Sequence, residues 1–228
     1  AESFNIYPTV DDKYLTYEEL EKKIKKLQTD KDGNLIILYA QNKDEQYTYI
    51  ESAKEKGYEV LLLDSPIIPH LMQKLESKKE KIKFSRVDSD TLENLIKKDE
   101  EVISKLTDEE KEKLKPMIET AVENEKYTVQ LEALDSNSMP FMLAQPEFMR
   151  RMKEMQQTGG GAMGNLPEMY SLIVNTNHEL VGKILNTRTE KKRNSLIKQS
   201  IDLAKLSQNN LTGKDLTEFI NRSIDLIK

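Results

Sequence analysis

Three short apolar runs, separated by polar and helix-like stretches, dominate the first hundred residues. The runs are LIILYA (35–40), YEVLLLD (58–64) and IKFSRV (82–87). Each has the length and the aliphatic composition of a buried strand, and the stretches at 46–56 and 66–77 have the mixed pattern of helices. Strands connected through helices at this spacing predict βαβ units and a mostly parallel sheet. We therefore expect a small three-layer α/β subdomain over residues 1–97.

Several predicted helices begin with a Thr or Asp that is followed three residues later by an acidic residue. The pairs are Thr16 with Glu19, Asp90 with Glu93, Thr107 with Glu110 and Thr212 with Asp215. In such a pair the first side chain accepts a backbone N–H of the first helical turn, and the acidic side chain reaches back to the cap. The charged stretch KKDEE at 97–101 has few apolar anchors. We place a domain boundary there, so that the second domain covers residues 98–228.

Three further strand-like runs indicate a small sheet in this second domain. They are YTVQLEAL (127–134), SMPFMLAQ (138–145) and MYSLIVN (169–175). A helix with apolar positions on one side, at about 108–122, precedes them. The segment PEFMRRMKEMQQTGGGAMG (146–164) lies between the last two runs. We expect this segment to loop out between two strands.

The end of the chain predicts two helices joined by a short loop at 209–213, which is an αα-hairpin. Their apolar residues spread over more than the roughly 100° stripe that one neighbouring element needs. Two hairpins paired across a two-fold axis as a four-helix bundle would cover both faces, and two-fold symmetry is the commonest in oligomers. The residues we expect in this dimer contact are Leu196, Ile197, Ile201, Leu203, Ala204, Leu216, Phe219, Ile220, Ile224 and Ile227.

Methionines at i, i+3 and i+6 mark the helix that is predicted inside 146–164. They are Met149, Met152 and Met155, and Phe148 precedes them. Methionine is unbranched and polarisable, so a surface rich in it adapts to many apolar partners. Arginine, lysine and glutamate occupy the other faces, and glycines follow at 159–164. We expect a loosely tied, exposed helix; the alternative is that the methionines pack on the neighbouring sheet and the protein is a simple structural dimeriser.

Composition excludes several function classes. Lys and Arg number 35 against 40 Asp and Glu, without a basic face for nucleic acid. There is no cysteine for disulfides or thiolate sites, and no apolar run reaches the roughly 18 to 20 residues of a membrane span. His70 and His178 lie in no metal-ligand pattern, and the glycines at 159–164 lack the ending of a phosphate loop. We expect a soluble, cytoplasmic protein that binds neither metal, membrane nor nucleic acid.

An enzyme remains the alternative function. Asp64, Ser65 and His70 follow the second apolar run, where an open parallel sheet would bind a ligand. No second acid, base or phosphate loop converges there in the sequence. The alternative is therefore a small α/β enzyme with an oligomerisation tail.

Five segments, in order, resemble the C-terminal portion of the bacterial HtpG-type chaperones of the heat shock protein 90 family. They are GYEVLLLDSPIIPHLMQKLE (57–76), FSRVDSD (84–90), PEFMRRMKEM (146–155), LIVNTNHELVGKIL (172–185) and DLAKLSQNNLTGKDLTEFINRSIDLI (202–227). The resemblance implies that residues 1–97 end the family's middle segment and that the rest is its dimerisation domain. It also implies a four-helix bundle between protomers and a client-binding helix at Phe148, Met149, Met152 and Met155.

The resemblance further implies which activities the chain lacks. The family's ATP-binding domain is missing here, so we expect no ATP, magnesium or other cofactor in this chain and no catalytic residue. The implied partners are a second copy, unfolded or partly folded client proteins, and the bacterial seventy-kilodalton chaperone system. The long glycine stretch at 159–164 departs from the family's pattern and bears on where the client-binding helix lies.

Overall fold

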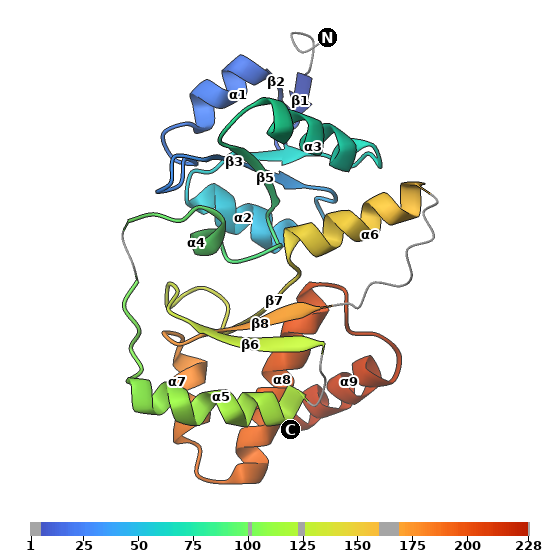
Figure 1. The fold of residues 1–228 in the computed structure, drawn as a ribbon. Coiled ribbons are helices and arrows are strands. Elements are labelled where there is room, and N and C mark those ends of the chain that lie inside the picture. Colours follow the sequence, from blue (N-terminus) through green and yellow to red (C-terminus); the bar gives the residue numbers. More distant parts are fainter. Residues whose placement is uncertain (1–5, 100–101, 123–125, 160–168, 228) are drawn as a thin grey trace. The chain divides into compact units, whose positions relative to one another are not determined.

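The computed structural model describes residues 6–99, 102–122, 126–159 and 169–227 (Figure 1). The chain forms two compact units, residues 1–100 with 145–166 and residues 101–144 with 167–228, here called the first and second units. The predicted domains, 1–97 and 98–228, stay a prediction. The segment with the methionines, however, belongs to the first unit although it is joined in sequence to strands of the second.

A three-stranded parallel sheet lies at the centre of the first unit. Its order is β4 (Val60–Leu62), β3 (Leu35–Ala40) and β5 (Ile82–Arg86). The predicted parallel sheet is therefore confirmed, because all three apolar runs form its strands. Two short antiparallel strands that the pattern did not predict, β1 (Ile6–Pro8) and β2 (Tyr14–Thr16), precede it.

Helices cover both faces of this sheet. Helices α1 (Tyr17–Ile24) and α3 (Ile68–Lys78) lie on one face, and α2 (Tyr47–Glu55) lies on the other (Figure 1). Every residue of β3 is buried, as expected for a strand covered on both sides. The core between α1, α3 and the sheet includes Leu20, Ile24, Ile37, Tyr39, Leu61, Met72 and Phe84. A short helix, α4 (Leu92–Leu95), follows β5.

Two of the predicted capping boxes are confirmed, and one is wrong. Glu19 N donates to Thr16 Oγ1 at 3.3 Å while Thr16 N donates to Glu19 Oε2 at 2.8 Å. Thr107 and Glu110 make the same two bonds at 2.8 and 3.3 Å. Helix α4 is instead capped by Thr91, whose hydroxyl accepts Asn94 N at 3.2 Å. A threonine one residue nearer the helix therefore replaces the expected aspartate.

The second unit packs a mixed sheet against helices. The strands β6 (Tyr127–Glu132), β8 (Tyr170–Asn175) and β7 (Phe141–Ala144) lie in this order, parallel for the first pair and antiparallel for the second. The helices are α5 (Asp108–Val122), α7 (Glu179–Asn186), α8 (Glu190–Ser207) and α9 (Gly213–Ile227). Helices α5, α7 and α8 share one core with the sheet (Figure 1). The sequence pattern did not predict α7.

Two buried asparagines join the segments that meet where β8 ends. Asn175 Oδ1 accepts Leu134 N at 3.2 Å and Asn177 N at 3.0 Å, and Asn175 Nδ2 donates to Asp135 O at 2.7 Å. Asn177 Nδ2 donates to Leu134 O at 3.0 Å, and Asn177 Oδ1 accepts Lys105 N at 2.6 Å. These side chains therefore satisfy backbone groups of segments that have no strand partner at this point.

We predict that Asn175→Ala destabilises the second unit by about 3 kcal/mol, because it leaves buried backbone donors and acceptors without partners. Urea unfolding, followed by circular dichroism, measures the change. Asn210→Ala, at an exposed position, is the control and should leave the midpoint unchanged. Equal midpoints for the two variants would contradict the structural role of Asn175.

Candidate functional site

Helix α6 (Glu147–Gly159) carries the methionines, and one of its faces is charged. Glu147, Arg150, Arg151 and Glu154 follow the i, i+3, i+4, i+7 spacing that places residues on one side of a helix. This set is called the charged face below. It contacts α3, β3 and β5 of the first unit, and the Arg150 side chain is only 4% exposed. The inward side of α6 is therefore its polar side.

The Glu147 carboxylate lies at the centre of these contacts. Its Oε1 accepts the Tyr39 hydroxyl at 2.8 Å, Arg150 Nη2 at 2.6 Å and Arg151 Nε at 2.6 Å. Its Oε2 accepts the backbone N–H of Arg86 at 3.2 Å. The carboxylate thus joins β3, β5 and its own helix through four donors.

Arg151 connects α6 to α3 and to the edge of β5. Its guanidinium donates to Glu76 Oε2 at 2.7 Å, to Glu76 Oε1 at 3.2 Å and to Phe84 O at 2.6 Å. Glu76 Oε1 in turn accepts Phe84 N at 2.7 Å. Side chains from α3 and α6 therefore satisfy both backbone groups of Phe84 on the side away from β3, where a further strand would otherwise pair.

Arg150 lies deeper than Arg151. Its guanidinium donates to the Tyr39 hydroxyl, to Glu147 and to Glu154, and it stands 5.5 Å from the centre of the Tyr39 ring. Gln41 Nε2 donates to Glu154 Oε1 at 3.2 Å. Because Tyr39 is fully buried in β3, these contacts tie α6 to the core of the first unit.

The charged face lies at the carboxyl end of the parallel sheet, since Gln41 follows β3 and Arg86 ends β5. Open α/β sheets bind ligands at this end. Here the position is taken by α6, and Asp64, Ser65 and His70 are all exposed. No described residue arrangement supports the alternative of an enzyme site at these three positions.

The pKa values of the network follow from burial and from the opposite charges. Burial alone raises the pKa of Glu147, but the charges of Arg150 and Arg151 and their hydrogen bonds outweigh burial and hold this pKa below its ordinary value. Burial alone lowers the pKa of Arg150, whereas Glu147 and Tyr39 bring it above its ordinary value. Burial, with Glu147 beside it, raises the pKa of Tyr39. All three groups therefore keep their usual charge at neutral pH.

The other side of α6 is apolar and partly open. Phe148 is 69% exposed, and Met149, Met152 and Met155 are half-buried. These four residues are called the methionine face below. The expectation of a loosely tied helix is wrong for the described part of α6, because the charged face binds it to the first unit. The client-binding role of the four residues stays a prediction, and glycines 160–164 lie outside the described residues.

The predicted dimerisation residues of α8 and α9 differ in their burial. Ile197, Ile201 and Ala204 are buried in the core of the second unit. Leu203, Ile220 and Ile224 are 44%, 47% and 48% exposed, and Leu206, which was not in the predicted set, is also exposed. Half-buried positions are Leu196, Leu216 and Phe219, and the side chain of Ile227 lies outside the described residues. The predicted interface stays untested. The apolar surface available to a partner is that of Leu203, Leu206, Ile220 and Ile224, called the exposed group below.

Polar contacts fix α9 against α8. Arg222 Nη2 donates to the buried Asp202 Oδ2 at 2.5 Å, and Arg222 Nε donates to Gln199 Oε1 at 3.1 Å. Gln199 Nε2 donates to Ser223 Oγ at 2.9 Å. These directional bonds set the rotation of α9 about its axis, and so they determine which apolar residues face outward.

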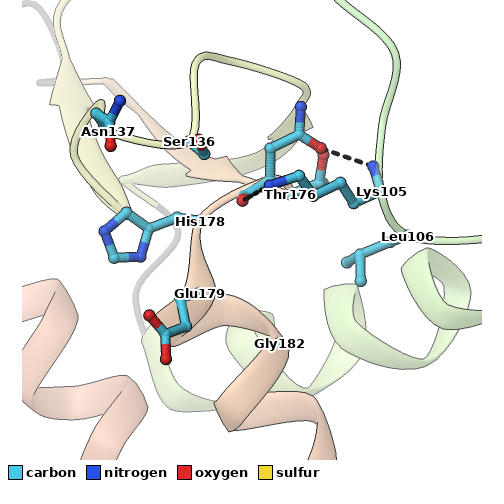
Figure 2. A pocket seen from close by; sticks show the side chains of 9 residues that line it. Lys105, Leu106, Ser136, Asn137, Thr176, His178, Glu179 and Gly182 are labelled. Atoms are coloured by element: carbon cyan, nitrogen blue, oxygen red, sulfur yellow. Dashed lines mark hydrogen bonds between the residues drawn. The ribbon is translucent and has the colours of Figure 1, made fainter.

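A pocket of about 520 Å³ opens in the second unit beside the start of α7 (Figure 2). Its lining is polar and apolar in equal parts, and its polar residues include Lys105, Ser136, Asn137, Asn177, His178 and Glu179. His178 Nδ1 accepts Leu180 N at 3.0 Å, so this histidine caps α7. In the described ranges no group of three or more His, Cys, Asp or Glu could hold a metal ion. Within the same ranges, none of the helices has the length and apolar character needed to cross a membrane.

Comparison with known proteins shows similarity to one kind of protein along the whole chain. The chaperone protein HtpG of Bacteroides thetaiotaomicron is 35% identical over 296 aligned residues, which cover 100% of this chain and 44% of the relative. HtpG of Bacteroides fragilis is 34% identical with the same coverage. HtpG of Porphyromonas gingivalis is 38% identical over 211 residues, which cover 90% of this chain and 31% of the relative. The chain thus spans less than half the length of these relatives, and no protein-family model matches it.

We predict that the Glu147 carboxyl titrates below the roughly 4.3 of an unperturbed glutamate. A carboxylate whose pKa is lower in the folded state stabilises that state above the unfolded pKa, and this stabilisation is lost as the pH falls through the folded value. The docking of α6 should therefore persist through mildly acidic pH and weaken only as the pH falls below the ordinary pKa of a glutamate. Carbon NMR of the side chain, assigned with Glu147→Gln, measures the midpoint. A midpoint above that of unperturbed glutamate would contradict the network.

Proposed function

Because the chain belongs to the HtpG-type chaperones of the heat shock protein 90 family and matches their C-terminal portion, we propose that it holds partly folded client proteins. In this proposal the methionine face of α6 binds exposed apolar segments of the client. The outward face of α8 and α9 joins two copies of the chain. The observation that carries the proposal is a helix anchored by its charged side with its apolar side directed away from the anchor.

The chemistry of the methionine face suits clients that share no sequence. Thioether side chains are flexible and polarisable, so Met149, Met152 and Met155 can adjust to apolar groups of different shape. Burial of a fully exposed Met or Phe side chain gives roughly 1.5 to 3 kcal/mol, and the half-buried methionines here have less to gain. Phe148 has the largest exposed share. Binding of this kind is weak and reversible, as release of a client requires.

The outward face of the α8–α9 hairpin suits a second copy of the chain. Leu203, Leu206, Ile220 and Ile224 lie on two helices that Arg222 and Asp202 hold together. A face shared by two helices can pair with the same face of a second copy about a two-fold axis, and the two hairpins then form a four-helix bundle. The exposed group supplies the apolar contact, while Ile197 and Ile201 support α8 from within each protomer.

The proposal assigns no chemical step to this chain. The sequence resemblance implies ATP-driven closure in the family, and we assign that step to parts of the relatives outside the matched region. Client holding by this chain is accordingly independent of ATP. A link to the bacterial seventy-kilodalton chaperone system belongs to the same proposal for the longer protein.

We predict that Met149→Glu with Met152→Glu reduces client holding by at least half, because carboxylates on the methionine face oppose apolar contact. The measurement is light scattering from denatured citrate synthase diluted into buffer with the chain present. Tyr14→Ser, which removes a 71% exposed aromatic side chain elsewhere on the first unit, is the control. Unchanged suppression of aggregation by the double variant would contradict the client site.

We also predict that Leu203→Glu with Ile220→Glu gives a monomer at concentrations where the unmodified chain is a dimer. Each substitution places a carboxylate in the proposed apolar contact, and both positions are exposed, so each protomer stays folded. Multi-angle light scattering over a dilution series measures the mass. Lys191→Glu, an exposed charge change near the start of α8, is the control. A monomeric unmodified chain would overturn the proposed dimer.

A further inference from the structure

We propose that Tyr39, Glu76, Glu147, Arg150 and Arg151 form a latch that positions the methionine face, and that client holding depends on this latch. The inference rests on the proposed function and names what controls its site. None of these five residues has to touch a client. They act through α6, and are therefore positioning residues.

Helix α6 is too short to be stable by itself. It runs from Glu147 to Gly159 and has 13 residues. Isolated helices shorter than roughly 12 to 15 residues are marginal in water, because the first turn orders several residues for a single hydrogen bond. A helix of this length therefore needs tertiary contacts to stay formed.

The contacts that keep α6 formed come from the charged face. Amphipathic helices normally gain their stability by burying the apolar side. Here Phe148 is mostly exposed and the methionines are only half-buried, whereas Arg150 is almost fully buried. Glu147, Arg151 and Glu154 are half-buried like the methionines, but they make the ion pairs and hydrogen bonds that hold α6 to the first unit. The ion-pair network therefore supplies the anchor, and Phe148 remains exposed for contact with a client.

The contacts of the charged face also fix the orientation of α6. Tyr39 donates to Glu147 and accepts from Arg150, so one buried hydroxyl joins the core strand to both charges. Arg151 contacts three acceptors on α6, α3 and β5, namely Glu147, Glu76 and the carbonyl of Phe84. A guanidinium presents its donors in a fixed plane, so such contacts hold both the position and the rotation of the helix. The latch therefore fixes which residues of α6 face outward.

The experiment compares two readouts on the full chain. Hydrogen–deuterium exchange reports the order of α6, and suppression of citrate synthase aggregation reports client holding. The latch variants are Tyr39→Phe, which removes only the hydroxyl, and Arg151→Ala. The matched controls are Tyr47→Phe and Arg188→Ala, both at exposed positions. Arg151→Lys keeps the charge but not the planar fork.

In Arg151→Ala we expect the amides of α6 to exchange at least about tenfold faster, as loss of a charged hydrogen bond implies. Tyr39→Phe should show a smaller increase, and Arg151→Lys should recover part of the protection. Exchange in β3, β8 and α8 should stay as in the unmodified chain, which separates a local effect from general unfolding. Client holding should fall in the same order as α6 protection.

Two results overturn the inference. One is an α6 that exchanges equally slowly in Arg151→Ala and in Arg188→Ala. The other is faster exchange of α6 with full client holding. If the proposed function is wrong, the result is different. Met149→Glu with Met152→Glu would then hold clients as well as the unmodified chain does, while α6 stays protected from exchange. In that case the latch variants would loosen α6 without any loss of client holding, which also overturns the dependence that we propose.

Discussion

The arrangement of the candidate site depends on the hydrogen bonds and ion pairs that the Glu147 carboxylate makes. It lies among four donors from β3, β5 and α6, and each of its oxygens is used. A buried carboxylate without such partners would be strongly disfavoured, so its ionised form and the docked position of α6 require each other. Arg150 has the same need, because its buried guanidinium finds acceptors only when Tyr39, Glu147 and Glu154 surround it. The orientation of the methionine face is a consequence of these requirements.

Much of the fold could be predicted from local sequence pattern. LIILYA reads as a strand because every position is apolar, and all six residues are buried between helices. The pairs Thr16 with Glu19 and Thr107 with Glu110 each mark the start of a helix, because the capping bonds form within four residues of sequence. Helix α7 was not predicted, because its cap is a histidine, which accepts Leu180 N in place of the usual hydroxyl or carboxylate. At α4 the pattern favoured Asp90, but the neighbouring Thr91 can also cap and is the residue that does so.

The orientation of α6 could not be predicted from its amphipathic pattern alone. The pattern identifies an apolar side and a charged side. Because amphipathic helices usually bury their apolar side, the pattern predicts that this side faces a neighbouring element or a partner. The acceptors that bury the charged side are Tyr39, Glu76 and the backbone of Phe84, each more than 60 residues away in sequence. One local signal existed. Glu147, Arg150, Arg151 and Glu154 are two acidic and two basic residues at helical spacing, so they pair within the helix and present a nearly neutral surface that can be buried.

A polar anchor has a different effect on a binding helix from an apolar one. Desolvation offsets much of the attraction within a buried ion pair, so the network stabilises the helix little more than an apolar anchor of the same size would. Loss of one partner, however, leaves a buried charge unpaired, so the network holds α6 in one geometry. An apolar anchor for α6 would have required methionines or other apolar residues on both sides of the helix. Such a helix could dock through either side, and its client surface would compete with its anchor for the same contacts. In the function proposed above, charges hold α6 and methionines bind, so the two tasks are separate and a client would gain apolar contact without displacing the helix that carries it.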